Sequence, residues 1–278
     1  MKISEALIET SKILLQAGIS NHAMEARLLL GHAMNVSEEY LILHKGLEIS
    51  PAQLKILQEM VDRRAKLEPM AYILGRKEFF SREFVVNSHV LIPRPDSEVL
   101  IESVLKDYKG CEGLNILDLG TGSGCLIITL LLELQNAAGI AVDIDSHALS
   151  IAQANADSLD VKNLQFIQSN WFDALQSTHH FDIIIANPPY IWGSENVAQE
   201  TLLYEPHLAL FAQNQGLEPY EIISKQARNF LKPEGSIYLE IGFDQAQDVT
   251  DLFLGRGYKN PVKTQDLAGH VRCLKFQI

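Results

Sequence analysis

Cysteine is scarce in this chain. Its 278 residues include three cysteines, Cys111, Cys125 and Cys273, which form neither a Cys-x-x-Cys pair nor an even-numbered set. This argues against a disulfide framework, and reduced thiols in a cytoplasmic protein are the simplest account. The sequence also lacks a signal-type apolar core at its start and any apolar run near the roughly 20 residues that span a membrane. We therefore expect a cytoplasmic protein with no membrane contact.

Positive charge is in short supply as well. The chain has 23 Lys and Arg residues against 35 Asp and Glu residues, a formal net charge of -12. A negative net charge does not attract a phosphate backbone, so we expect no stable binding to nucleic acid. A local basic patch is still compatible with this composition. Hydrophobic residues make up 47% of the chain, which provides a core of ordinary size and argues against disorder.

The hydrophobic pattern divides the chain into three parts. Residues 1–67 carry apolar side chains at helical spacing and predict a small helical domain, for which a docking module and a structural cap are both open. Residues 68–95 combine a short aromatic pattern with an X-Pro stretch and predict a linker that contains a β-hairpin. Residues 96–278 contain the larger domain.

The larger domain alternates strand and helix patterns. The predicted strands are Asn115–Leu119, Ile140–Asp143, Leu164–Gln168, Ile183–Ala186, Ser236–Ile241, Tyr258–Val262 and Val271–Phe276. Helical stretches between the earlier strands predict a mostly parallel, doubly wound α/β sheet, and the closely spaced last strands favour an antiparallel edge. Ligands of such sheets bind at the carboxyl ends of strands, where the strand order reverses.

A glycine-rich loop follows the first of these strands. Asp118 and Leu119 lead into Gly120–Gly124, whose glycines allow a ligand to approach the backbone just before a helix N-terminus. Roughly 20 residues further on, Asp143 is placed to accept hydrogen bonds from ribose hydroxyls. The GxGxG spacing differs from the GxGxxG of dinucleotide sites, and an acid at position 118 suits a cation better than a pyrophosphate. These residues favour S-adenosylmethionine over NAD.

A second polar motif, Asn-Pro-Pro-Tyr at Asn187–Tyr190, follows the apolar strand Ile183–Ala186. The two prolines fix φ and lack N–H groups, so the loop neither continues a ladder nor begins a helix at once. Its carbonyls, the Asn187 amide and the Tyr190 ring then form a rigid pocket that suits a planar NH2 group. Trp171, after the third strand, either stacks on an adenine ring or belongs to the edge of the core.

Together these motifs resemble those of class I S-adenosylmethionine-dependent methyltransferases that modify planar amino groups. The segments Leu91–Glu98 and Tyr72–Gly75, with the N-terminal helices, narrow the resemblance to the bacterial release-factor glutamine methyltransferase family (PrmC/HemK) over essentially the whole chain. The resemblance implies a seven-stranded Rossmann-like sheet and a small N-terminal helical domain joined by a β-hairpin linker. Two departures are Asn170, where Asp is usual and which we leave outside the site, and Ser97, which replaces Thr and keeps the hydroxyl.

The resemblance also implies roles for individual residues. It assigns the cofactor S-adenosylmethionine, with S-adenosylhomocysteine as its product, to Gly120, Thr121, Gly122, Ser123, Gly124, Asp143, Trp171 and Asn187. It assigns substrate binding to Asn187, Pro188, Pro189 and Tyr190, of which Asn187, Pro188 and Tyr190 are the catalytic residues. No metal is expected.

The implied substrate is the glutamine of the Gly-Gly-Gln motif in class I peptide-chain release factors, methylated on its side-chain nitrogen, N5. An amide nitrogen is a poor nucleophile because its lone pair is shared with the carbonyl group. The Asn187 side-chain oxygen and the Pro188 carbonyl would accept hydrogen bonds from the two N–H groups of this amide. This is electrostatic preorganisation rather than base catalysis. We expect a monomer whose residues 1–67 dock the substrate protein.

Three other functions compete with this interpretation. A DNA methyltransferase acting on adenine N6, or on another exocyclic amine such as cytosine N4, would use the same tetrapeptide, but it needs base flipping and a basic surface. A non-enzymatic binding protein with a vestigial fold would not need the intact loop, acid and tetrapeptide. An NAD dehydrogenase would need the other glycine spacing.

Overall fold

A computed structural model of the chain describes residues 1–193 and 197–278. The chain forms two compact units. The first contains residues 1–75 and 197–204, and the second contains residues 76–193 and 205–278. Within the described residues, no helix combines the length and the apolar character needed to cross a membrane.

The first unit is helical. Its helices are α1 (Ile3–Gln16), α2 (His22–Met34), α3 (Glu38–Leu43), α4 (Pro51–Arg64), α5 (Met70–Leu74) and α9 (Gln199–Tyr204). Helix α4 begins where the sequence predicts, because Ser50 and Gln53 form a capping box and Pro51 takes the first helical position. Arg64 is buried and pairs with Glu25 at 2.6 Å and with Glu200 at 3.0 Å, so its charge is compensated.

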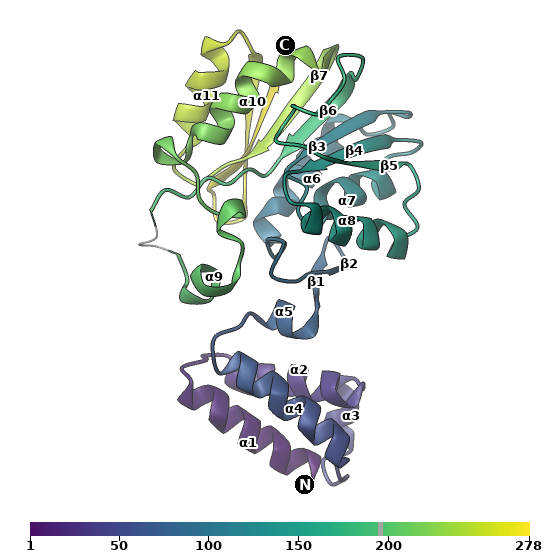
Figure 1. The fold of residues 1–278 in the computed structure, drawn as a ribbon, viewed down its shortest axis with the longest axis vertical. Helices are drawn as coiled ribbons and strands as arrows, with labels where there is room; N and C mark the ends of the chain where they lie inside the picture. Colours follow the sequence, from purple (N-terminus) through teal and green to yellow (C-terminus); the bar gives the residue numbers. More distant parts are fainter. Residues whose placement is uncertain (194–196) are drawn as a thin grey trace. The chain divides into compact units, whose positions relative to one another are not determined.

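The second unit is an α/β domain (Figure 1). Its strands are β1 (Arg76–Phe79), β2 (Arg82–Val85), β3 (Asn115–Leu119), β4 (Ala138–Asp143), β5 (Leu164–Gln168), β6 (Phe181–Ala186), β7 (Leu231–Glu240), β8 (Lys259–Gln265) and β9 (Val271–Gln277). Its α-helices are α6 (Glu98–Asp107), α7 (Cys125–Glu133), α8 (Ser146–Ser158), α10 (Glu218–Gln226) and α11 (Ala246–Gly255). Short 3-10 helices cover Pro95–Ser97, His207–Ala209, Asn214–Gly216 and Ala227–Asn229.

Seven strands form one sheet in the order β5-β4-β3-β6-β7-β9-β8, and β1 and β2 form a separate hairpin. Strand β9 runs antiparallel to β7 and β8, and the other neighbours are parallel. The predicted α/β sheet with an antiparallel edge is therefore confirmed. The predicted strand 258–262 ends too early, because β8 is an exposed edge strand whose residues carry little apolar signal.

The strand order explains where a ligand can bind. Successive side chains of β6 point to opposite faces of the sheet: Ile183 and Ile185 pack with α6 and α7, whereas Ile184 and Ala186 pack with α10 and α11. The order reverses between β3 and β6, where Leu119 pairs with Ala186. The loops that follow these two residues therefore leave the sheet side by side.

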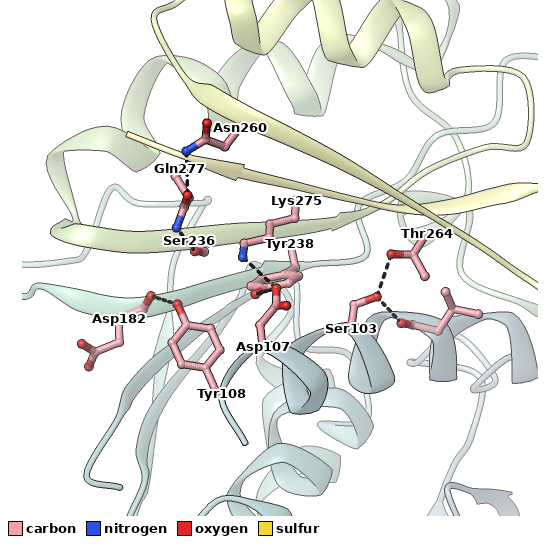
Figure 2. Close-up of polar contacts among 11 residues, drawn as sticks. Ser103, Asp107, Tyr108, Asp182, Ser236, Tyr238, Asn260, Thr264, Lys275 and Gln277 are labelled. Atoms are coloured by element: carbon pink, nitrogen blue, oxygen red, sulfur yellow. Dashed lines mark hydrogen bonds and ion pairs between the residues drawn. The ribbon is translucent and has the colours of Figure 1, made fainter. Parts of the chain in front are cut away.

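Helix α6 is tied to the sheet along its length (Figure 2). The Ser103 hydroxyl contacts Thr264 at 3.1 Å, and the Asp107 carboxylate accepts hydrogen bonds from Tyr238 and Lys275 at 2.7 Å each. Near its start, Asp96 pairs with Arg272 of β9 at 2.9 Å. These contacts hold α6, which follows Ser97, against β7, β8 and β9.

Candidate active site

The predicted site residues gather at the carboxyl edge of β3, β4 and β6. A cavity of about 220 Å³ opens there. Its lining includes most of the predicted set, namely Gly120, Thr121, Gly122, Ser123, Asp143, Trp171, Asn187, Pro188 and Pro189. The structure thus brings the two motifs together, although they lie far apart in the sequence. Their roles as cofactor and substrate ligands stay predictions.

Two predicted residues lie just outside this lining. Gly124 is the N-cap of α7 with φ +79, and a Cβ on it would lie 3.1 Å from the Ala152 side chain of α8, so glycine suits both the backbone turn and the packing of the two helices. Tyr190 is half-buried, and burial raises the pKa of its hydroxyl, which keeps the side chain neutral.

The glycine loop leaves its backbone open to a ligand. Gly120 and Gly122 have φ of +73 and +54, and nothing lies within 4 Å of the position that a Cβ would take on either residue. The Gly122 N–H donates to Asp143 Oδ2 at 2.9 Å, and the Asp145 N–H donates to Asp143 Oδ1 at 3.0 Å. Asp143 therefore fixes the loop and still faces the cavity with its remaining lone pairs.

Asp118 lies beneath the glycine loop, outside the cavity lining. Its carboxyl is 1% exposed, and Oδ2 accepts a hydrogen bond from the Thr121 hydroxyl at 2.6 Å. The other oxygen, Oδ1, is buried and has no hydrogen-bond partner among the described residues. Burial raises the pKa of Asp118 to about 7, Thr121 opposes the rise, and the charge of Asp143 adds to it. A nearby cation would reverse this shift.

The raised pKa of Asp118 predicts a stability that depends on pH. The unfolded chain loses the Asp118 proton near pH 4 and the folded protein near pH 7, so folding stability falls as the pH rises between these values. We expect Asp118→Asn to be about 2 to 4 kcal/mol more stable than the parent chain at pH 8, and to show little difference at pH 4.5. Urea denaturation of the ligand-free protein at both pH values measures this, with exposed Asp157→Asn as the control. An equal gain at both pH values would contradict the linkage.

Asn187 begins the tetrapeptide directly after β6. Its Nδ2 donates to the Ser97 hydroxyl at 3.2 Å, and Ser97 is 3% exposed at the start of α6. The amide nitrogen is therefore engaged with the protein, which leaves Oδ1 as the acceptor toward the cavity. Pro188 is buried and Pro189 half-buried behind it.

Gln245, a residue that no sequence motif singled out, holds the end of the tetrapeptide. Its Oε1 accepts from the Gly242 N–H at 3.0 Å, and its Nε2 donates to the Tyr190 carbonyl at 3.1 Å. Gly216 packs against the same carbonyl. A buried glutamine in a loop after a strand is a weak signal, so only the three-dimensional structure reveals this support.

Gly216 offers a test of this packing. It has φ +81, and an added Cβ would overlap the Tyr190 carbonyl oxygen and lie 2.5 Å from Gln245 Nε2. We expect Gly216→Ala to lower the free energy of unfolding by about 2 to 4 kcal/mol, because strain and overlap add. Gly255→Ala is the control, since nothing lies within 4 Å of its Cβ position. Urea denaturation of both variants measures the difference, and equal midpoints would contradict the expectation.

Two further segments complete the cavity wall. One contributes Pro93 and Arg94, and the other contributes Pro206 and Leu208. They are joined through Glu205, which pairs with Arg94 and accepts a hydrogen bond from the Ile92 N–H at 3.1 Å. Arg94 belongs to the motif Leu91–Glu98, whose pattern resembles that of a family but predicted no role for Arg94 itself.

Trp171 lies where the core meets the cavity, and its stacking on an adenine ring stays a prediction. It lines the cavity and also packs against the hydrophobic cluster that contains Phe172 and Phe181. Its φ of +53 is unusual for a large side chain, so the surrounding structure determines its position. Asn170, which we left outside the predicted set, also lines the cavity, and its Nδ2 donates to Asp173 at 3.3 Å.

The sheet order, the glycine loop and the cavity at the strand reversal define a methyltransferase domain. Residues 111–252 match the family model described as a methyltransferase domain, and residues 5–75 match that of the PrmC N-terminal domain. The release factor glutamine methyltransferase of Shewanella oneidensis is 38% identical over 272 residues, which cover 98% of this chain and 94% of the relative. The chain belongs to the release factor glutamine methyltransferase family, as its motifs predicted.

Other relatives are longer than this chain. A bifunctional methyltransferase of Rickettsia typhi is 44% identical over 295 residues, which cover 99% of this chain and 57% of the relative. The chain therefore spans little more than half the length of such relatives. Among solved structures, a methyltransferase from Pyrococcus furiosus has a TM-score of 0.54 at 18% identity and covers 80% of this chain and 98% of its own, which shows a shared fold.

Proposed function

We propose that this chain transfers a methyl group from S-adenosylmethionine to N5 of the glutamine in the Gly-Gly-Gln motif of class I peptide-chain release factors. One observation carries the proposal: the glycine loop after β3 and Asn187 after β6 face one cavity, because Leu119 and Ala186 are paired neighbours. A cofactor site thereby adjoins a rigid acceptor for an NH2 group. Membership of the family supports the same reaction.

The cavity residues fit S-adenosylmethionine. The open backbone at Gly120 and Gly122 would accept the methionine portion, Asp143 would accept the ribose hydroxyls, and Trp171 would pack against the adenine. The unpartnered Oδ1 of Asp118 and the raised pKa of its carboxyl suit a ligand with positive charge. The bound cofactor supplies an electrophilic methyl group on a sulfonium.

Asn187 and Pro188 prepare the amide for reaction. The Asn187 Oδ1 and the Pro188 carbonyl accept hydrogen bonds from the two N–H groups of the substrate amide. These hydrogen bonds orient its nitrogen toward the methyl carbon. The nitrogen would take the methyl group from the cofactor, which would leave as S-adenosylhomocysteine. The nitrogen releases one proton to solvent, and no side chain is needed as a base.

The division of labour along the chain is part of the same proposal. Residues 1–67 dock the release factor, residues 68–95 link the parts, and residues 96–278 carry the chemistry, in a monomer. A net charge of -12 favours this over methylation of an exocyclic amine in DNA.

One experiment tests the reaction and its rival together. The chain is incubated with methyl-labelled S-adenosylmethionine and, in separate reactions, a purified release factor, the same factor with its Gly-Gly-Gln glutamine replaced by alanine, and duplex DNA. We expect label on the intact factor alone, located on the glutamine side chain by mass spectrometry. Label on the alanine variant or on DNA would overturn the proposed substrate.

A further inference from the structure

Glu240 is a buried acid next to the candidate site for which the proposed chemistry has no role so far. It ends β7, and the register that pairs Ala186 with Leu239 makes it the lateral neighbour of Asn187. It is 3% exposed, and its Oε2 is buried without a hydrogen-bond partner among the described residues. Keeping a carboxyl in such a place costs stability, and such groups concentrate at functional sites.

The surroundings of Glu240 include the groups that hold Asn187. Burial raises the pKa of Glu240 to about 7, and hydrogen bonds with Ser97 and Asn187 and the charge of Arg272 oppose the rise. Ser97 is itself the acceptor for Asn187 Nδ2. Ser97, Asn187 and Glu240 therefore form one polar cluster behind the cavity, on three different elements.

We propose that Glu240 is a positioning residue, which acts through its hydrogen bonds with Ser97 and Asn187 to turn the Asn187 amide so that its oxygen faces the substrate. The inference rests on the proposed function. The physical reason is the direction of the hydrogen bonds. An ionised carboxylate only accepts, so the hydrogen bond that lowers the pKa of Glu240 runs from the Ser97 hydroxyl to the carboxylate. The Ser97 oxygen then accepts from Asn187 Nδ2, which leaves Oδ1 for the substrate amide.

Ser97 alone does not set this direction. A hydroxyl both donates and accepts, so it would bond equally well to Asn187 Oδ1 if the amide were turned over. The turned amide would present N–H donors to a substrate NH2 group and repel it. A protonated Glu240 removes the constraint, because it can donate to the Ser97 oxygen. The constraint is thus present when Glu240 is charged and is lost when it is neutral.

The thiols, the phenols and the guanidinium around Glu240 do not change charge in the same pH range. Its charged and titratable neighbours are Asp96 before α6, Cys125 of α7, Tyr190 of the tetrapeptide, Tyr220 of α10, and Arg272 and Cys273 of β9. Burial raises the pKa of both thiols to about 12 and raises that of both tyrosines, so they remain neutral. Arg272 remains charged and is paired with Asp96 and Asp266.

Glu240→Gln tests the role, because glutamine keeps the shape but both donates and accepts. At pH 8 we expect kcat for methyl transfer to a release factor to fall about tenfold with an unchanged cofactor Kd, since a charge-assisted hydrogen bond is replaced by a neutral one. The parent chain gains activity as the pH rises through about 7. The variant lacks this rise, which is the acid limb of the pH–rate profile. The control Glu234→Gln makes the same change at an exposed position of β7 and leaves rate and limb unchanged.

Two further measurements separate positioning from loss of structure. The Ser97→Ala and Glu240→Gln effects on kcat should not add in the double variant, because both break one chain of hydrogen bonds. In protein labelled with 15N-asparagine, the Asn187 side-chain signal, assigned by its loss in Asn187→Asp, should shift with a midpoint near pH 7 and lose that shift in Glu240→Gln.

The outcomes separate the positioning role of Glu240 from the proposed methyl transfer on which it rests. If the parent chain labels no glutamine, the proposed function fails, and the Asn187 signal still reports on Glu240. If the parent chain is active and Glu240→Gln keeps its rate and acid limb, the positioning role is wrong. At saturating cofactor, Asp118→Asn keeps the acid limb; its loss there would assign the limb to Asp118 and overturn the role of Glu240.

Discussion

Asn187→Ala is expected to lower kcat for glutamine methylation on the order of 100- to 1,000-fold, the loss typical of a preorganised polar group at a reacting centre. The substitution removes the side-chain acceptor at the carboxyl end of β6. The nitrogen of the substrate amide then stays planar and is poorly oriented toward the methyl carbon. Affinity for S-adenosylmethionine should change little, because the loop Gly120–Ser123 and Asp143 stay intact.

Calorimetry with the cofactor and single-turnover methyl transfer to a purified release factor measure the two effects separately. The exposed Asn229→Ala is the matched control, since it removes the same side chain far along the sequence from the motif. Near-normal turnover in Asn187→Ala would contradict the assigned role. A parallel loss of cofactor affinity would show that Asn187 also binds the cofactor, the second role that the family resemblance implies for it.

The strands that carry this site were predictable because their burial leaves a direct trace in the sequence. Ile183–Ala186 is apolar throughout, as a strand covered on both faces must be, and the motifs after β3 and β6 follow such runs. Parallel strands then bring their carboxyl ends to one edge. Edge strand β8 left no such trace, and its predicted bounds were wrong.

The supports of the site were harder to foresee, because they depend on which strands become neighbours. Ser97 and Asn187 are 90 residues apart in the chain and touch only once α6 has packed on the sheet. Glu240 did leave a signal, as an acid inside the apolar stretch Ser236–Ile241. Its neighbour Asn187 could be identified only once β6 and β7 were known to be adjacent in the sheet. Asp118 was expected to suit a cation, which stays a prediction; its hydrogen bond with Thr121 and its place outside the cavity lining were not foreseen.

Asp143→Ala is expected to weaken the binding of S-adenosylmethionine and S-adenosylhomocysteine on the order of 100-fold. The carboxylate accepts from the Gly122 and Asp145 N–H groups, and in the proposed function it also accepts from the ribose. Losing one charged hydrogen bond to the ligand costs about 1.5 to 3 kcal/mol, and a loosened loop adds to this. Asp143→Asn keeps one acceptor oxygen, and its affinity for both ligands should fall between those of the parent chain and Asp143→Ala.

Calorimetry with S-adenosylhomocysteine measures the loss, and urea denaturation shows whether the variant is folded. The control is Asp157→Ala, which removes an exposed carboxylate from α8, the helix that follows Asp143. Comparison with a 2′,3′-dideoxyribose analogue separates the two contributions of Asp143. The parent chain should discriminate strongly between the two ligands and Asp143→Ala weakly, because only the ribose contact depends on the hydroxyls. Equal discrimination in both proteins would limit Asp143 to holding the glycine loop.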